Sequence, residues 1–130
     1  MSYIQHKSEE SLEDYLETIL VLSRRLSDVR SIDVANEMNY SKPSVSVAVK
    51  NLKGRGYITV AEDGYIRLTA TGKKIAEDVY ERHTLLRDWL IHLGVDPEIA
   101  AQDACKMVHD ITPESYEAMK KCILPLLSDP

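Results

Sequence analysis

The sequence has few cysteines and no long apolar run. No stretch approaches the roughly 18 apolar residues of a membrane-spanning helix, and the opening residues, MSYIQHKSEESLEDY, contain no apolar segment of the kind that a secretory signal requires. In a reducing compartment the two cysteines, Cys105 and Cys122, are expected to be free thiols or metal ligands rather than a disulfide. We therefore expect a cytoplasmic protein that contacts no membrane.

The sequence also lacks the marks of an enzyme. It contains no glycine-rich phosphate loop, no internal repeat and no low-complexity tract. Outside one candidate metal site we find no acid/base pair and no nucleophile constellation. The 130 residues, 44% hydrophobic and 28% charged, suit one ordinary globular domain, or a small domain with an appended helical piece. We expect a binding protein and not an enzyme.

The charge is unevenly distributed along the chain. The total is -5, yet residues 40–75 contain seven basic and two acidic residues, a local charge of +5 that leaves -10 for the remainder. A basic segment inside an acidic protein is typical of a nucleic-acid-binding region.

The first half of the chain predicts a winged helix-turn-helix. Apolar residues recur at helical spacing from Ser8 to about Leu26, and two short helices, 32–38 and 42–54, follow with the turn NYSKP between them. Ser41 is the expected N-cap of the second short helix. After it the period changes to two in YITV and YIRL, which flank the hairpin-turn signal Asp63-Gly64.

The second half predicts three further helices. The first is long and ends at Gly94, the next opens at Asp96-Pro97, and the last opens at Thr112 and ends near Leu127. The predicted fold class is mainly α: a winged helix-turn-helix DNA-binding domain, residues 1–74, followed by a helical metal-binding and dimerisation domain, residues 75–130.

The helix over 42–54 is the expected recognition helix. If it buries Val45 and Leu52, its outer face is small, polar and cationic, apart from one valine. Lysines and serines would meet DNA phosphates, and the apolar side chains would meet thymine methyl groups in the major groove. The predicted DNA contacts are Ser41, Lys42, Pro43, Ser44, Ser46, Val47, Lys50 and, on the wing, Arg67.

Five residues on three helices carry groups that bind transition metals. Asp14 and Glu17 share a face of the first helix, His83 lies on the inward stripe of the long helix, and Cys105 and His109 are one turn apart in ACKMVHD. Carboxylate, imidazole and thiolate together suit Mn(II), Fe(II), Co(II) or Zn(II), and do not suit Ca(II) or Mg(II). Spacing alone leaves open whether these residues form a site or fill a surface and a core.

The chain resembles the iron- and manganese-dependent repressors of the DtxR/MntR family, and the likeness covers nearly the whole chain. The residues that carry it are SLEDYLETIL at 11–20, ANEMNYSKPSVSVAVKNLKGRGYI at 35–58, LTATGKKIA at 68–76, ERHTLLRDWL at 81–90 and GVDPEIAAQDACKMVH at 94–109. The LTATGKKIA segment is common among winged-helix regulators. The order of EDYLE, RHTLL and the cysteine-histidine helix is much more specific.

The resemblance implies that Asp14, Glu17, His83, Cys105 and His109 are the metal ligands. It also implies a homodimer that binds a palindromic operator in double-stranded DNA when metal is bound, and so represses metal-uptake genes. Mn(II) or Fe(II) is the expected metal, with Zn(II) or Co(II) as further possibilities. Val108 stands where both branches of the family carry a glutamate ligand, which favours one metal per chain.

The resemblance further implies a switch. A palindromic operator needs two recognition helices about 34 Å apart, and metal would select the dimer geometry that fits. Because the sequence ends at residue 130, we expect the two-domain architecture of the manganese branch, without the SH3-like domain of the iron branch. Two alternatives stay open: a winged-helix transcription factor with a degenerate metal site, and a thiol-based redox sensor acting through Cys105.

Overall fold

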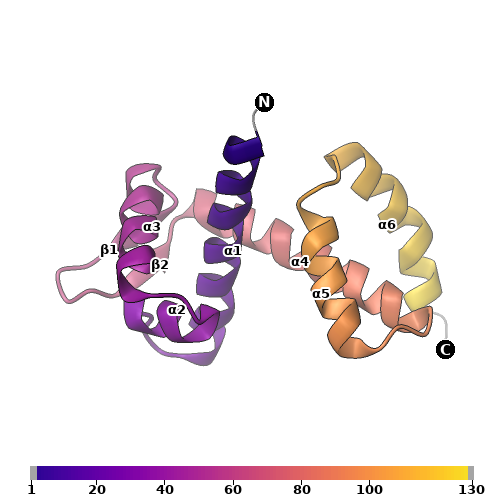
Figure 1. Cartoon of the computed structure of the whole chain (residues 1–130), viewed down its shortest axis with the longest axis horizontal. Coiled ribbons are helices and arrows are strands. Elements are labelled where there is room, and N and C mark those ends of the chain that lie inside the picture. The colour runs from indigo at the N-terminus through magenta and orange to yellow at the C-terminus, as the bar shows by residue number, and fades with distance from the viewer. Residues whose placement is uncertain (1–2, 129–130) are drawn as a thin grey trace. The chain divides into compact units, whose positions relative to one another are not determined.

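The computed structural model of the chain describes residues 3–128, with side chains from Ser11 onward. Its elements are α1 (Tyr3–Arg25), α2 (Ser31–Met38), α3 (Lys42–Gly54), β1 (Ile58–Val60), β2 (Ile66–Leu68), α4 (Ala70–His92), α5 (Pro97–Val108) and α6 (Pro113–Ser128) (Figure 1). The chain forms two compact units, one ending at Asp78 and one beginning at Val79, so that α4 contributes to both. This mainly helical architecture confirms the predicted fold class.

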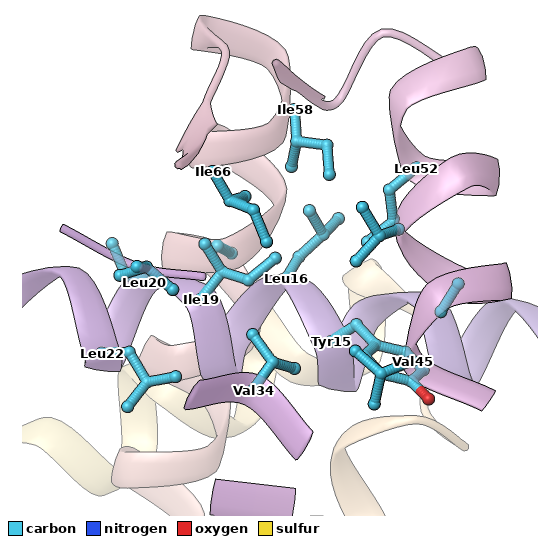
Figure 2. Close-up of a cluster of buried hydrophobic side chains, with 14 of the residues drawn as sticks. Tyr15, Leu16, Ile19, Leu20, Leu22, Val34, Val45, Leu52, Ile58 and Ile66 are labelled. Carbon is cyan, nitrogen blue, oxygen red and sulfur yellow. The ribbon is translucent and has the colours of Figure 1, made fainter. Parts of the chain in front are cut away.

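The first unit is built on the apolar face of α1. Side chains from α1 meet those of α2, α3 and the two strands in one cluster, in which Leu16, Ile19, Leu52 and Ile58 are almost completely buried (Figure 2). Full burial of each such side chain contributes about 1.5–3 kcal/mol. Leu26, predicted to continue the stripe, is 40% exposed because α1 ends at Arg25.

The helix-turn-helix forms where the sequence predicts it. The backbone leaves α2 through Asn39, whose left-handed conformation (φ 57°) suits an asparagine. Two residues later Ser41 is the N-cap of α3. This helix begins at Lys42 and ends at Gly54, as predicted. Val34 of α2 and Val45 of α3 are completely buried against α1 and lock the two short helices together.

The wing is an antiparallel pair of short strands, β1 and β2. Ile58 pairs with Leu68, Thr59 with Arg67 and Val60 with Ile66. Gly64 adopts φ 89° in the connecting turn, a conformation that glycine adopts without strain. The predicted hairpin is confirmed, although each strand is one residue shorter than expected.

Gly72, in the first turn of α4, lies very close to the backbone that leads into the wing. The Thr69 hydroxyl donates to the carbonyl of Gly56 (2.7 Å) and accepts from the Gly72 backbone N–H (3.1 Å), which caps α4. A Cβ atom on Gly72 would lie 1.9 Å from the carbonyl oxygen of Tyr57. The glycine of LTATG is therefore required by packing and not by an unusual backbone angle.

The second unit is a three-helix arrangement with a small core. Leu85 and Leu86 of α4, Ala104 of α5, and Tyr116 and Ile123 of α6 are buried together. As predicted, Gly94 ends α4, here with φ 102°, and the Asp96 side chain caps α5 by accepting from the Glu98 N–H (3.1 Å).

The outer side of the second unit mixes polar and apolar side chains. Cys122 is exposed on α6. Ile123 is buried, and Trp89 and Leu127 pack partly against the unit's own core. Other large apolar side chains stay exposed: Ile91, Leu93, Ile99, Leu124 and Leu126. Within the described part of the chain, no helix is long and apolar enough to cross a membrane.

Candidate metal centre and nucleic-acid interface

Hydrogen bonds of a serine side chain cap the N-terminus of the recognition helix α3. The Ser41 Oγ accepts from the backbone N–H of Ser44 (3.3 Å) and donates to the Ser44 hydroxyl (2.8 Å). Pro43 falls in the first turn, where its missing N–H costs no hydrogen bond. These local interactions set the residue at which the outer face of α3 begins.

Burial divides α3 into two faces. Val45, Ala48, Val49 and Leu52 face the core. The remaining predicted contact residues of the helix are all exposed: Ser41, Lys42, Pro43, Ser44, Ser46, Val47 and Lys50. Val47 is 69% exposed, which is unusual for a valine and leaves its methyl groups available to a partner. The face therefore offers hydroxyl, ammonium and methyl groups side by side.

Arg67, predicted as a wing contact, projects from β2 with 70% of its side chain exposed. Its guanidinium donates to the Asp28 carboxylate across 3.4 Å, a distance at the weak end of ion pairing. Asp28 lies in the segment between α1 and α2.

This segment contains contacts that sequence reasoning missed. The Ile66 N–H donates to the Val29 carbonyl (2.7 Å), so Val29 forms an antiparallel bridge with β2. The Arg30 guanidinium lies over the Tyr65 ring, 4.6 Å from its centroid. The alternation of charged and apolar residues in Asp28-Val29-Arg30 is typical of extended backbone, but it does not identify β2 as the partner.

In the first unit, two candidate metal ligands lie on α1. Asp14 and Glu17 are half-buried and one turn apart, beside the buried residues Tyr15 and Leu16. The Thr18 hydroxyl donates to the backbone carbonyl of Asp14 (2.9 Å), which keeps the helix regular at this point. The two carboxylates thus share one flank of the apolar stripe.

In the second unit, the other three candidates lie on α4 and at the C-terminal half of α5. The His83 Nε2 lies 3.2 Å from the carbonyl oxygen of Ala101 on α5, and His83 is half-buried, as its position on the inward stripe predicts. Ala101, Cys105 and His109 follow one another at intervals of four, so they lie on one face of α5. His83 therefore adjoins the face that carries the thiol and the second imidazole.

The C-terminal end of α5 determines where His109 and Val108 lie. The helix ends at Val108, and His109 is its C-cap residue with φ -90° and ψ -14°, so its side chain still continues the face of Cys105. Val108 is buried and presents no ligand atom. Thiolate, imidazole and carboxylate are the ligand types that bind divalent transition metals in proteins.

Comparison with known families agrees with both halves of this description. Residues 8–66 match the iron dependent repressor, N-terminal DNA binding domain, and residues 69–130 match the iron dependent repressor, metal binding and dimerisation domain. The chain belongs to the iron-dependent repressor family. This is a family of metal-dependent, DNA-binding transcriptional regulators, and the resemblance seen in the sequence is confirmed.

Individual relatives support this membership. The transcriptional regulator MntR of Escherichia coli O6:H1 is 36% identical over 111 residues, which cover 85% of this chain and 72% of that protein. An uncharacterized HTH-type transcriptional regulator of Methanocaldococcus jannaschii is 30% identical over 115 residues, covering 85% and 90%.

Solved structures share the fold of this repressor-family chain. The manganese regulator SloR superposes with a TM-score of 0.76 at 28% identity, and the metal-dependent transcriptional regulator MtsR with 0.80 at 26%. Each match covers 85% of this chain and 52% of the solved one. The chain therefore spans about half the length of these solved relatives.

Proposed function

We propose that the protein is a metal-activated transcriptional repressor of metal-ion uptake or homeostasis genes. It acts in the cytoplasm as a homodimer on a palindromic operator and catalyses no reaction. Residues 1–74 bind DNA, and residues 75–130 bind metal and dimerise. The observation that supports this best is the exposed polar and cationic face of α3, with Val47 at its centre, in a chain that also carries a transition-metal ligand set.

The proposed metal ligands are Asp14, Glu17, His83, Cys105 and His109. These carboxylate, imidazole and thiolate groups would hold a Mn(II) or Fe(II) ion, which would supply the positive charge that keeps them in one arrangement. Through Asp14 and Glu17 the metal site would include α1, which shares a core with α3. Through His83 and the Cys105 face of α5 it would include helices of the second unit. With the ligands held in this way, the conformation in which two recognition helices fit the operator would be favoured.

We propose one metal per chain. Val108 is buried and apolar at the α5 position where the family resemblance implies a glutamate ligand. Replacing a carboxylate by a thiolate also shifts preference from Mn(II) toward softer ions, because thiolate is the softer ligand. Fe(II) and Zn(II) are therefore expected to compete well with Mn(II).

Anaerobic titration of the metal-free protein with Mn(II), Fe(II) and Zn(II) tests this proposal. We expect about one ion per chain, with the affinity of His109→Ala reduced at least tenfold. His92→Ala is the matched control, because His92 is an exposed histidine in the last turn of α4. Equal binding by wild type and His109→Ala would disprove the site.

Duplexes selected from a random library test the switch. The protein is incubated with the library with and without Mn(II), and bound DNA is sequenced. Enrichment of a palindrome only in the presence of metal supports the repressor. Equal enrichment without metal would point to the winged-helix factor with a degenerate site. Release of the selected DNA by peroxide, reversed by a thiol reductant, would point to the redox sensor.

A further inference from the structure

Three consecutive contacts tie the segment Asp28–Arg30 to β2. Asp28 pairs with Arg67 through their side chains (3.4 Å), Val29 with Ile66 through the backbone (2.7 Å), and Arg30 with Tyr65 through a cation–π contact (4.6 Å to the ring centroid). Each step along one segment is matched by one step backward along the other. A single antiparallel bridge between Val29 and Ile66, flanked by these two side-chain contacts, thus extends the wing.

The two faces of this extended wing differ in chemistry. Side chains alternate between faces along a strand, and Val29 and Ile66, both buried, form the inner face. Asp28, Arg30 and Arg67 are exposed and share the outer face with half-buried Tyr65. The outer face therefore carries two guanidinium groups and one carboxylate in a fixed order.

The cation–π contact leaves Arg30 able to bind an anion. A guanidinium that stacks on a ring uses its planar face, while its N–H donors point outward in the plane. The N-terminus of α2 itself is satisfied, because the Asp33 carboxylate accepts from the Arg30 backbone N–H (2.8 Å). An incoming anion would therefore be held by the side chain of Arg30 and not by the helix end.

We propose that this outer face is a second DNA-backbone contact, beyond the recognition helix. Arg30 binds phosphate, Tyr65 is its positioning residue, and Arg67 binds phosphate after leaving Asp28. Asp28 weakens DNA binding, because its carboxylate competes with phosphate for Arg67 and repels the DNA backbone. The proposal rests on the DNA-binding function proposed above and assigns to Arg30, Tyr65 and Asp28 roles that the recognition helix does not supply.

The chemistry of the pair with Asp28 favours exchange. Both side chains are largely solvated, 70% exposed for Arg67 and 38% for Asp28, and such pairs contribute little stability. Arginine–phosphate pairing is frequently bidentate and is correspondingly stronger. Arg67 can therefore change partners at small cost.

Binding to a labelled duplex of mixed sequence, about 30 base pairs long, tests the proposal by fluorescence anisotropy. Affinity is measured with saturating Mn(II) from about 50 to 200 mM salt, where the slope of log affinity against log salt reports phosphates neutralised, about 0.9 per phosphate. Arg30→Gln should weaken binding and lower the slope by about 0.9 per bound chain. Lys121→Gln, a charge loss on exposed α6, should leave the slope unchanged.

Asp28→Asn should have the opposite effect. We expect tighter binding, by about two- to fivefold for a freed surface charge. Glu117→Gln removes one exposed acid from α6 and should give a smaller gain. Tyr65→Phe keeps the ring and should match wild type, whereas Tyr65→Leu should bind like Arg30→Gln. Thermal melting by circular dichroism identifies any variant that has lost its fold.

An unchanged slope for folded Arg30→Gln would overturn the proposal, and so would Asp28→Asn binding no tighter than Glu117→Gln. If the wild type binds the duplex but gains no affinity from metal, the proposed metal switch is wrong. The salt dependence of Arg30→Gln then still tests whether Arg30 binds phosphate. If the wild type does not bind even at low salt, both proposals fail.

Discussion

The two units differ in how completely they cover their own apolar surface. The first unit encloses a broad core from α1 to the start of α4, and among its described residues the large apolar side chains exposed at 40–69% are Leu26, Ile32, Tyr40 and Val47. The second has a much smaller core and exposes Leu93, Ile99, Leu124 and Leu126 at 43–60%.

The difference matches the two kinds of partner. A DNA backbone requires solvated cations, and only a single apolar side chain is needed for contact with thymine methyl groups. A second protein copy requires contiguous apolar surface, since association depends on its burial. The family's description of the second domain as a dimerisation domain is consistent with this exposure. Variants that affect one unit and spare the other test the comparison.

The largest expected effect falls on the first unit. Gly72→Ala places a Cβ atom 1.9 Å from the Tyr57 carbonyl oxygen, a backbone atom that cannot rotate away. We expect a loss of about 3 kcal/mol or more in unfolding free energy. Gly54→Ala is the control, because a Cβ there meets no atom within 4 Å and alanine favours helix.

Urea denaturation separates the two units. Trp89, the sole tryptophan of the sequence, packs against the core of the second unit, so its fluorescence reports that unit. Gly72→Ala should shift the circular dichroism transition much more than the tryptophan transition. Equal shifts in both signals would show that the units unfold as one.

The second-largest effect is a pH dependence in the second unit. Tyr116 is 2% exposed, and burial, aided by the nearby Glu81 carboxylate, raises its pKa to about 12. Above pH 10 an unfolded tyrosine loses its proton while the folded one keeps it. The stability that this group contributes is therefore complete below pH 10 and is lost between pH 10 and 12.

A tyrosine-to-phenylalanine pair measures this contribution. Raising the pH from 8 to 11.5 should cost the wild type about 2 kcal/mol more than Tyr116→Phe, by tryptophan-detected unfolding. Tyr80→Phe removes a more exposed phenol, on α4, and should behave like wild type. An identical pH dependence for Tyr116→Phe and wild type would contradict the assignment.

The third prediction separates the two partner surfaces. Leu124→Asp should weaken self-association at least tenfold, about 1.4 kcal/mol, because it places a charge in exposed apolar surface of α6. Val47→Asp, on α3, should leave self-association unchanged and abolish DNA binding. Sedimentation over a dilution series and the duplex assay measure the two properties, and dissociation of both variants would show that the comparison is wrong.

Local patterns made the fold predictable. Helical and strand periodicity, the Ser41 cap and the Asp63-Gly64 turn act within a few residues, so the sequence alone predicted α3 from Lys42 to Gly54 and the wing. Pairing of Asp28–Arg30 with β2 depends on a register between segments far apart in the chain. Exposure of Cys122 depends on how α6 rotates over a small core. Neither follows from local pattern.

The candidate sites were predictable to different degrees. The exposed face of α3 follows from helical periodicity once its buried residues are known. The proposed ligand set does not, because Asp14, His83 and Cys105 lie on three helices and spacing cannot join them. That set came from the family resemblance, and within the second unit the structure adds one independent geometric observation, the approach of His83 to the Ala101 carbonyl.

The smallest predicted effect compares one helix cap in each unit. Ser41→Ala removes the acceptor for the Ser44 N–H in α3, and Asp96→Ala removes the acceptor for the Glu98 N–H in α5. Each should cost about 1 kcal/mol of stability. Only Ser41→Ala should also weaken duplex binding beyond what the small loss of folded protein explains, since Ser41 is itself a proposed DNA contact. Equal weakening of DNA binding by Asp96→Ala at saturating metal would show that a change in the second unit affects the DNA-binding surface. The assignment of DNA binding to the first unit alone would then be wrong.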